Sequence, residues 1–113
     1  MSQQTEKRSR SGVRVPTGAS IQVTNGFYQG LEVPIDREWL VIGRGCSADL
    51  VIAEPTISRA HAAVGFDADG FFVQDLGSTN ETQVNGARIE RLALTNGDCL
   101  QMGKLLVEVT VPG

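Results

Sequence analysis

Residues 60–76 read AHAAVGFDADGFFVQDL, the clearest indication of secondary structure in the chain. Two apolar runs, 60–66 and 71–76, flank the segment Asp67-Ala68-Asp69-Gly70, which has the composition of a turn. Short runs that contain β-branched and aromatic residues on both sides of a turn predict a β-hairpin. We therefore expect two adjacent antiparallel strands in the middle of the chain.

The same pattern continues outward from this hairpin in both directions. Further strands are expected at residues 21–24, 31–35, 39–42, 50–52, 82–84, 98–102 and 105–111. Asn25-Gly26 and Asn85-Gly86 are strong hairpin signals, and Pro34 predicts an edge or bulge position for its strand. Frequent turn signals with no long helical pattern are typical of an antiparallel all-β sandwich or barrel, here of about ten or eleven strands.

The composition fits one domain and excludes several classes of protein. The chain has 113 residues, of which 41% are hydrophobic, enough for one core. No apolar run approaches the roughly 20 residues that span a bilayer, and the N-terminus lacks a secretory signal. Cys46 and Cys99 belong to no Cys/His cluster. We therefore expect a cytoplasmic protein with reduced thiols and no zinc site or membrane contact.

The net charge of −3 is divided unevenly along the chain. Residues 1–20 hold four basic groups and one acidic group, whereas residues 21–113 hold six basic and twelve acidic groups. The leading segment has too few apolar residues to offset the entropy of ordering, so we predict a disordered basic tail at 1–19 and a folded domain at 20–113. Four cations ahead of an acidic body do not favour a nucleic-acid partner.

The chain offers no convincing catalytic or metal-binding residues. His61 is the single histidine, and it follows Ser58 by three residues. Side chains in a strand alternate between its faces, so a triad of Ser58, His61 and Asp75 is not expected. The carboxylates are scattered singly, without the pairing that holds a divalent ion. We therefore predict no enzyme activity and no cofactor.

Small polar residues gather instead in two loop regions. The first pairs Gly43-Arg44 with Ser58-Arg59-Ala60-His61, and the second runs from Asp75 to Gly86. Arginine supplies charge and a fork of donors, and hydroxyl groups supply single donors, which together suit a tetrahedral anion. Loops on a rigid sandwich are also where binding residues are commonly placed.

These motifs resemble the forkhead-associated (FHA) domain in their order and spacing. The resemblance is carried by Gly43-Arg44, by Ser58 and His61 at the family's SxxH spacing, and by Ser78-Thr79-Asn80 with Asn85-Gly86, and it extends over residues 20–111. It implies an FHA-type β-sandwich of about eleven antiparallel-rich strands. It also implies a monomeric module that binds a phosphothreonine-containing partner, downstream of a Ser/Thr kinase, in signal transduction.

The resemblance assigns roles to individual residues. Arg44, Ser58 and Thr79 match the phosphate ligands, Arg59 follows the serine, and Asn80 matches the asparagine that holds the peptide main chain. Residues that match the structural support of the site are Gly43, His61, Asn85 and Gly86. Taken singly, the same residue types are also common as solvated arginines, caps and turn residues.

Glu81 departs from the family pattern, in which glycine usually follows the asparagine. If the glycine serves a positive φ, a glutamate strains the turn by about 1 kcal/mol, and its charge opposes a nearby phosphate. The hypothesis is that Glu81→Gly keeps the fold and tightens phosphopeptide binding, although Glu81 can also select a basic residue on the ligand. Residues 45–48 and 81–83 are the segments expected to choose the position three after the phosphothreonine.

Two other interpretations of the same chain stay open. In one, the FHA-type fold is a phosphate-independent interaction module. In the other, Thr5 is phosphorylated and the tail occupies its own site, since about fifteen flexible residues reach roughly 20 Å. The end at residues 111–113 fits either a free terminus or the start of a linker.

Overall fold

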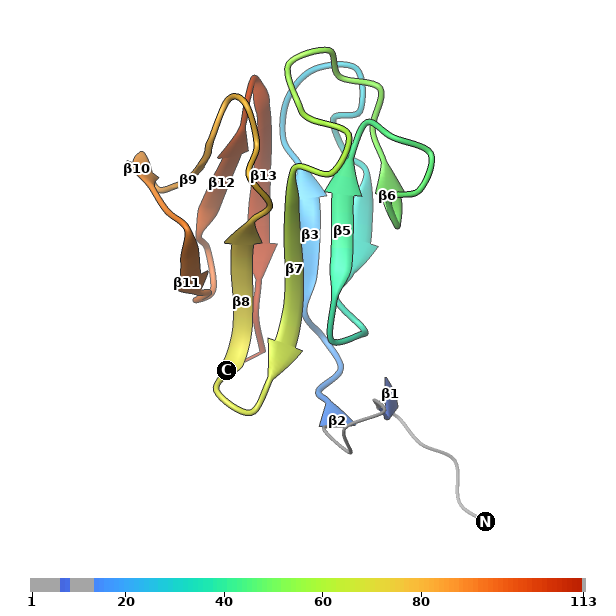
Figure 1. The fold of residues 1–113 in the computed structure, drawn as a ribbon. Helices are drawn as coiled ribbons and strands as arrows, with labels where there is room; N and C mark the ends of the chain where they lie inside the picture. Colours follow the sequence, from blue (N-terminus) through green and yellow to red (C-terminus); the bar gives the residue numbers. More distant parts are fainter. Residues whose placement is uncertain (1–6, 9–13, 113) are drawn as a thin grey trace.

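Two β-sheets pack face to face in the computed structural model, which describes residues 7–8 and 14–112 (Figure 1). The six-stranded sheet has the order β10 (Ala87–Arg88), β9 (Thr82–Val84), β12 (Cys99–Met102), β13 (Leu105–Thr110), β3 (Ser20–Val23) and β4 (Glu32–Pro34). The five-stranded sheet has the order β11 (Arg91–Ala93), β8 (Gly70–Asp75), β7 (Ala62–Asp67), β5 (Leu40–Gly43) and β6 (Leu50–Val51). Neighbours within these two sheets are antiparallel, except β5 and β6, which are parallel. The predicted all-β sandwich is confirmed.

The central hairpin forms as predicted from residues 60–76. Strands β7 and β8 pair in a register that places Asp67 opposite Gly70, so Ala68 and Asp69 make the turn. The backbone N–H of Asp69 donates to the carboxylate of Asp67, and Gly70 has a φ of 113°. Local side-chain chemistry and a glycine therefore close this hairpin.

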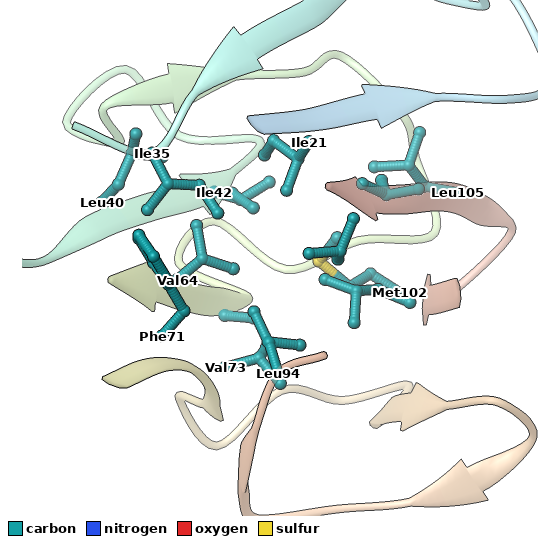
Figure 2. Packing of buried hydrophobic residues seen from close by; sticks show 14 of the residues in the cluster. Ile21, Ile35, Leu40, Ile42, Val64, Phe71, Val73, Leu94, Met102 and Leu105 are labelled. Carbon is teal, nitrogen blue, oxygen red and sulfur yellow. The ribbon is translucent and has the colours of Figure 1, made fainter. Parts of the chain in front are cut away.

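The core lies between the two sheets and is made of alternating side chains (Figure 2). In β3 and β13 every second residue is buried, as expected for strands with one face toward the core. The five-stranded sheet contributes Ile42, Val64 and Val73, each with no exposed surface. This packed layer gives the loops at its ends a rigid support.

The two Asn-Gly signals have different outcomes. Asn85 and Gly86 have φ values of 52° and 89° and join β9 to β10 in a two-residue turn, as predicted. The Asn25-Gly26 signal also lies in a hairpin, since β3 and β4 pair antiparallel with Gln22 opposite Glu32, but the connecting loop is much longer than two residues. The Asn25 side chain instead bonds the backbone of Lys104 and Leu106, so it links the loop to a distant strand.

The edges of both sheets differ most from the sequence expectation. Pro34 lies in the outermost strand β4, which confirms its predicted edge position. Strands β10 and β11 were not predicted, because every residue in them is exposed and no apolar alternation marks them.

The N-terminal segment lies at the end of the sandwich opposite the loops that follow β5 and β8 (Figure 1). Two short strands, β1 (Lys7–Arg8) and β2 (Arg14–Val15), pair antiparallel. Val15 and Ala19 are 2% and 3% exposed, so the packed core includes two residues ahead of the domain start predicted at residue 20. The disorder predicted for 1–19 otherwise falls largely on positions outside the described residues, as does Thr5. No helix among the described residues has the length and hydropathy needed to cross a bilayer.

Candidate functional site

Three loops at one end of the sandwich contain all five residues predicted to bind a phosphopeptide. They connect β5 to β6 (residues 44–49), β6 to β7 (52–61) and β8 to β9 (76–81), and they meet at the top of Figure 1. The predicted ligand residues Arg44, Ser58, Arg59, Thr79 and Asn80 all lie in these loops. The topology therefore brings residues far apart in the sequence to one end of the molecule.

Gly43 allows the first two loops to approach each other closely. A side chain at Gly43 would place its Cβ only 1.9 Å from the carbonyl oxygen of Arg59. Next to it, the N–H of Arg44 donates to the Ser58 carbonyl at 3.0 Å, and the N–H of Gly45 donates to the Arg59 carbonyl at 3.1 Å. The glycine before Arg44 is therefore needed for backbone contact between the loops.

The two arginines present their charges at the surface. Arg44 Nε donates to the Ile57 carbonyl at 3.0 Å, which fixes the side chain while the residue stays exposed. Arg59 is exposed as well. Within the described part of the chain, neither guanidinium forms a salt bridge with an acidic residue. Both positive charges are therefore available to an anionic ligand.

Ser58 and Asn80 join the β6–β7 loop to the β8–β9 loop. The N–H of Thr79 donates to Ser58 Oγ at 3.1 Å, so the Ser58 hydroxyl keeps its own proton for donation. Asn80 Nδ2 donates to the Thr56 carbonyl at 2.8 Å. The expectation placed Asn80 on the peptide main chain, and the structure shows that one of its N–H groups is already bonded within the fold. Asn80 and Thr79 are both exposed at the loop surface.

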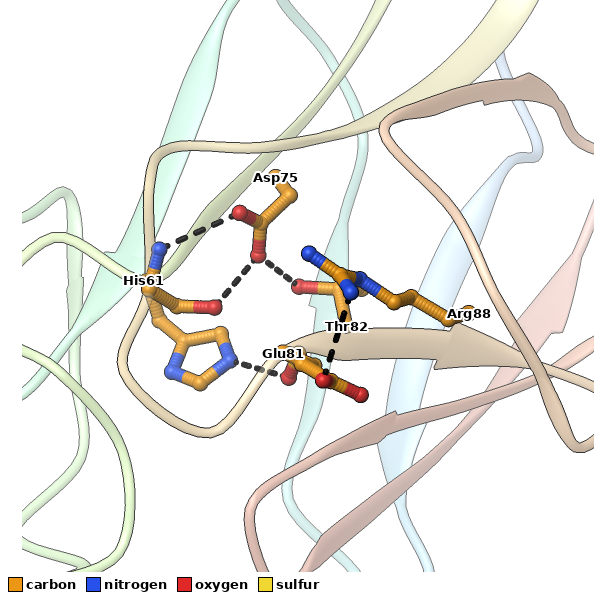
Figure 3. A network of polar contacts seen from close by, with 6 residues as sticks. His61, Asp75, Glu81, Thr82 and Arg88 are labelled. Atoms are coloured by element: carbon orange, nitrogen blue, oxygen red, sulfur yellow. Dashed lines mark hydrogen bonds and ion pairs between the residues drawn. The ribbon is translucent and has the colours of Figure 1, made fainter.

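His61 is fully buried and bridges the same two loops (Figure 3). The N–H of Ser58 donates to its Nδ1 at 3.0 Å, and its Nε2 lies 2.8 Å from the carbonyl oxygen of Glu81. Because Nδ1 accepts a hydrogen bond, we assign the proton to Nε2, which donates to Glu81. The ring bonds backbone atoms and neither the Ser58 hydroxyl nor the Asp75 carboxylate, so this geometry is that of a brace.

Asp75 organises the β8–β9 loop, a role that the sequence analysis missed. Its carboxylate accepts bonds from the N–H groups of Gly77 and Ser78, from Ser78 Oγ, and from Thr82 Oγ1 at 2.7 Å (Figure 3). Burial raises the pKa of Asp75, but these hydrogen bonds outweigh burial and hold the pKa below its ordinary value. The signal was an aspartate two residues before a glycine, the pattern of an Asx turn.

Glu81 adopts the left-handed backbone conformation, with a φ of 65°. This is the positive φ that the sequence comparison with the FHA pattern anticipated for the usual glycine. Its carboxylate lies 3.6 Å from Arg88 Nη1, and the two side chains are 42% and 65% exposed. The charge of Glu81 therefore lies at the surface, directly after Asn80.

Asn85 and Gly86 form a turn that the Asn85 side chain links to the loop before β12. Asn85 Nδ2 donates to Asp98 at 2.9 Å, and the N–H of Cys99 donates to Asn85 Oδ1 at 2.9 Å. Burial raises the pKa of Asp98, while bonds from Thr95 and Asn85 outweigh it and lower the pKa below its ordinary value. These residues support β9, which starts at the end of the candidate site.

Metal binding has no support among the described residues. No group of three or more His, Cys, Asp or Glu residues in this part of the chain is arranged to hold an ion. Cys46 and Cys99 are free and exposed thiols. The chemistry of the three loops is therefore that of cations, hydroxyls and amides, which suits an oxyanion ligand.

Several curated proteins similar to this chain are described as regulators or inhibitors. The chain is 35% identical over 105 residues to the glycogen accumulation regulator GarA of Mycolicibacterium smegmatis, covering 90% of this chain and 66% of the relative. It is 35% identical over 98 residues to an oxoglutarate dehydrogenase inhibitor of Corynebacterium jeikeium, covering 85% of this chain and 68% of the relative. GarA of Mycobacterium tuberculosis is covered over 60% of its length. The chain thus spans about two thirds or less of several curated relatives.

Solved structures and a family model identify the domain. A structure from a study of phosphothreonine-dependent FHA domain interactions has a TM-score of 0.78 and 26% identity, covering 87% of this chain and 99% of its own. The FhaA FHA domain, complexed with the intracellular domain of Rv3910, has a TM-score of 0.74 and 28% identity, covering 81% of this chain and 99% of its own. The model of the FHA domain matches residues 40–103. This chain belongs to the FHA domain family.

Proposed function

We propose that this domain binds phosphothreonine in a partner protein and so mediates a phosphorylation-dependent interaction in signalling. The observation that carries the proposal is the joining of the three loops, which hold Arg44, Ser58, Arg59 and Thr79. Among the described residues, neither arginine has an acidic partner. A phosphate monoester carries nearly two negative charges and three acceptor oxygens, which match these donors. Recognition of a phosphate by arginine is also a common mode of peptide binding.

The relatives support the same conclusion by their descriptions. One similar solved structure comes from work on phosphothreonine-dependent FHA interactions, and another is a complex with an intracellular protein domain. The regulator and inhibitor relatives favour a binding role over catalysis. A monomeric, non-catalytic, cytoplasmic module with a Ser/Thr kinase upstream completes the proposal.

The position of the N-terminal strands favours a ligand on another molecule. Pairing of Lys7–Arg8 with Arg14–Val15 holds the chain near Lys7 at the end opposite the three loops. Thr5 lies outside the described residues. Because the described strand β1 is at the end of the sandwich away from the three loops, we propose a partner in trans.

The proposal is tested by titrating the protein with degenerate peptide pools that carry phosphothreonine, phosphoserine or neither. We expect saturable binding to the phosphothreonine pool and roughly tenfold weaker binding to phosphoserine, which lacks the methyl group. Arg44→Ala should weaken binding by about 10- to 100-fold, because hydrogen bonds to charged groups contribute about 1.5–3 kcal/mol.

Arg91→Ala is the matched control, because Arg91 is an exposed arginine outside the three loops, and its ion-pair partner Asp67 lies at the other end of β7 from the β6–β7 loop. It should bind the phosphothreonine pool like the unmodified protein. Equal binding of phosphorylated and unphosphorylated pools, or no binding by a protein whose circular dichroism shows the β fold, would overturn the proposal in favour of a phosphate-independent contact.

A further inference from the structure

Glu81 is held in a backbone conformation that glutamate disfavours. Glu81 and Asn85 are the non-glycine residues with positive φ in the described chain. Asparagine tolerates this region because its short side chain bonds locally, as Asn85 does with Asp98 and Cys99. Glutamate has no such compensation. Unfavourable backbone conformations at non-glycine residues concentrate at functional sites, which makes the side chain of Glu81 a candidate for a role in binding.

The backbone on both sides of Glu81 is firmly anchored. Its carbonyl accepts a bond from the buried ring of His61 at 2.8 Å. The next residue, Thr82, is fully buried and bonds Asp75 at 2.7 Å. The Glu81 side chain therefore leaves from a fixed point directly after Asn80. Binding through this side chain therefore requires no further ordering of the backbone that carries it.

The carboxylate of Glu81 differs from the other acidic groups of the three loops. Asp49 accepts a bond from the N–H of Val41, and Glu54 accepts two bonds from Thr56. The Glu81 carboxylate accepts no hydrogen bond from the described residues. Its contact is the ion pair with Arg88 at 3.6 Å, longer than a hydrogen bond. Among the described residues, a donor on a ligand therefore competes for this carboxylate with Arg88 alone.

The ion pair with Arg88 is weak enough to be exchanged. The two side chains are 42% and 65% exposed, and exposed pairs of this kind contribute little to stability. Arg88 lies in the short edge strand β10, and its side chain extends to Glu81 (Figure 3). A cation on a bound peptide can therefore replace Arg88 at the carboxylate without disturbing the sandwich.

We propose, building on the phosphothreonine binding proposed above, that Glu81 selects ligands with an arginine or lysine beside the phosphothreonine. Arg88 is the intramolecular cation that the ligand's basic residue displaces. The same carboxylate disfavours acidic residues at that position, since it lies next to a site whose own cations are occupied by the phosphate. The ligand class is then a phosphothreonine peptide with a basic flank.

The test is an oriented peptide library with a fixed phosphothreonine and degenerate flanking positions, applied to the unmodified protein, Glu81→Gln and Arg88→Gln. Glutamine keeps the shape and the backbone strain and removes only the charge. We expect arginine and lysine to be enriched at one flanking position, and Glu81→Gln to keep phosphothreonine binding but lose that enrichment. Arg88→Gln should keep or increase it.

Two synthetic peptides that differ only by Arg or Ala at the enriched position then measure the effect. At low salt, we expect the unmodified protein to bind the arginine peptide about three- to fivefold more tightly than the alanine peptide. The Glu81→Gln variant should bind the two peptides with equal affinity. The preference should shrink as added salt screens the charges. No basic enrichment, or enrichment that survives in Glu81→Gln, overturns the inference.

The other outcomes separate this inference from the function on which it rests. Enrichment of acidic residues that is lost in Arg88→Gln overturns it and assigns the selection to Arg88. Absence of any phosphate-dependent binding overturns the proposed function as well, and it is recognised because Arg44→Ala then behaves like the unmodified protein. Phosphate-dependent binding with no flank preference overturns the role of Glu81 alone.

Discussion

The two ends of β9 each carry a non-glycine residue with positive φ, and they are stabilised in opposite ways. After the C-terminal end, Asn85 and Gly86 have φ values of 52° and 89°, and both residue types readily adopt this backbone conformation. Before the N-terminal end, Glu81 has a φ of 65°, a conformation that glutamate disfavours. That loop is held by His61, twenty residues earlier, and by Asp75 through Thr82. A turn built from suitable residues needs little help, whereas an unsuitable residue depends on the surrounding fold.

The largest expected effect comes from removing the distant support of the Glu81 loop. His61→Ala leaves a cavity at a fully buried position and removes two hydrogen bonds. We expect a loss of about 2–4 kcal/mol in the free energy of unfolding, measured by urea denaturation, and at least tenfold weaker phosphopeptide binding at protein concentrations where the fold persists. A loss below about 1 kcal/mol would show that the loop does not depend on His61.

Acidic pH distinguishes the two regions through their carboxylates. The pKa values of Asp75 and Asp98 are lowered from an ordinary value of 3.8. Groups with a lowered pKa in the folded state stabilise the fold fully above the ordinary value and lose that contribution as pH falls below it. The free energy of unfolding should therefore drop as pH falls below about 4.

Asp75→Asn and Asp98→Asn should each lower stability at neutral pH by about 1–3 kcal/mol and flatten the acid-induced loss. Only Asp75→Asn is expected to weaken phosphopeptide binding as well, because its bonds hold the loop that carries Thr79 and Asn80. Equal effects of the two variants on binding would contradict the separate roles of the two regions.

The turn at the other end of β9 should respond to local changes. Asn85→Ala removes the bonds to Asp98 and Cys99 and places alanine at a positive φ, so we expect a loss of about 1–2 kcal/mol in thermal or chemical unfolding. Asn85→Gly removes the same bonds without the backbone penalty and should lose less. Equal stability of the two variants would show that the positive φ at position 85 costs alanine no more than it costs glycine.

The smallest effect on stability is expected at Glu81. Glu81→Gly should raise the free energy of unfolding by up to about 1 kcal/mol, because glycine accepts a φ of 65°. It should also tighten binding to a degenerate phosphothreonine pool, since a carboxylate next to the phosphate site is removed. Glu81→Ala removes the charge but keeps the strain. Affinity unchanged in both variants would show that the charge is neutral for binding.

The hairpin at residues 60–76 and the turn at Asn85-Gly86 were predictable because their signals are local. Alternating apolar residues and turn-forming residues act within a few positions of each other. Asn25-Gly26 also marked a hairpin, but the length of its loop was not predictable, because the Asn25 side chain bonds the backbone of Lys104 and Leu106. The exposed edge strands β10 and β11 left no apolar pattern to find.

The candidate residues could be named from sequence motifs, whereas the hydrogen bonds that hold their loops together could not. The motif residues Arg44, Ser58 and Asn80 were chosen by their resemblance to a family, and the fold places them in adjoining loops. For Asp75, the sequence pattern suggested no role beyond a catalytic triad that strand geometry argues against. Its function as the acceptor for the β8–β9 loop became visible only with the positions of Ser78 and Thr82.

Alternation, turn chemistry and charge are local properties, so the all-β class, the central hairpin and a set of residue types suited to a phosphate can be inferred from the residues alone. Only the folded chain places Gly43 against the backbone of Arg59, bonds His61 to both Ser58 and Glu81, and brings Glu81 to Arg88. These contacts join residues from different strands and loops. Their geometry depends on how the two sheets pack, which local patterns do not specify.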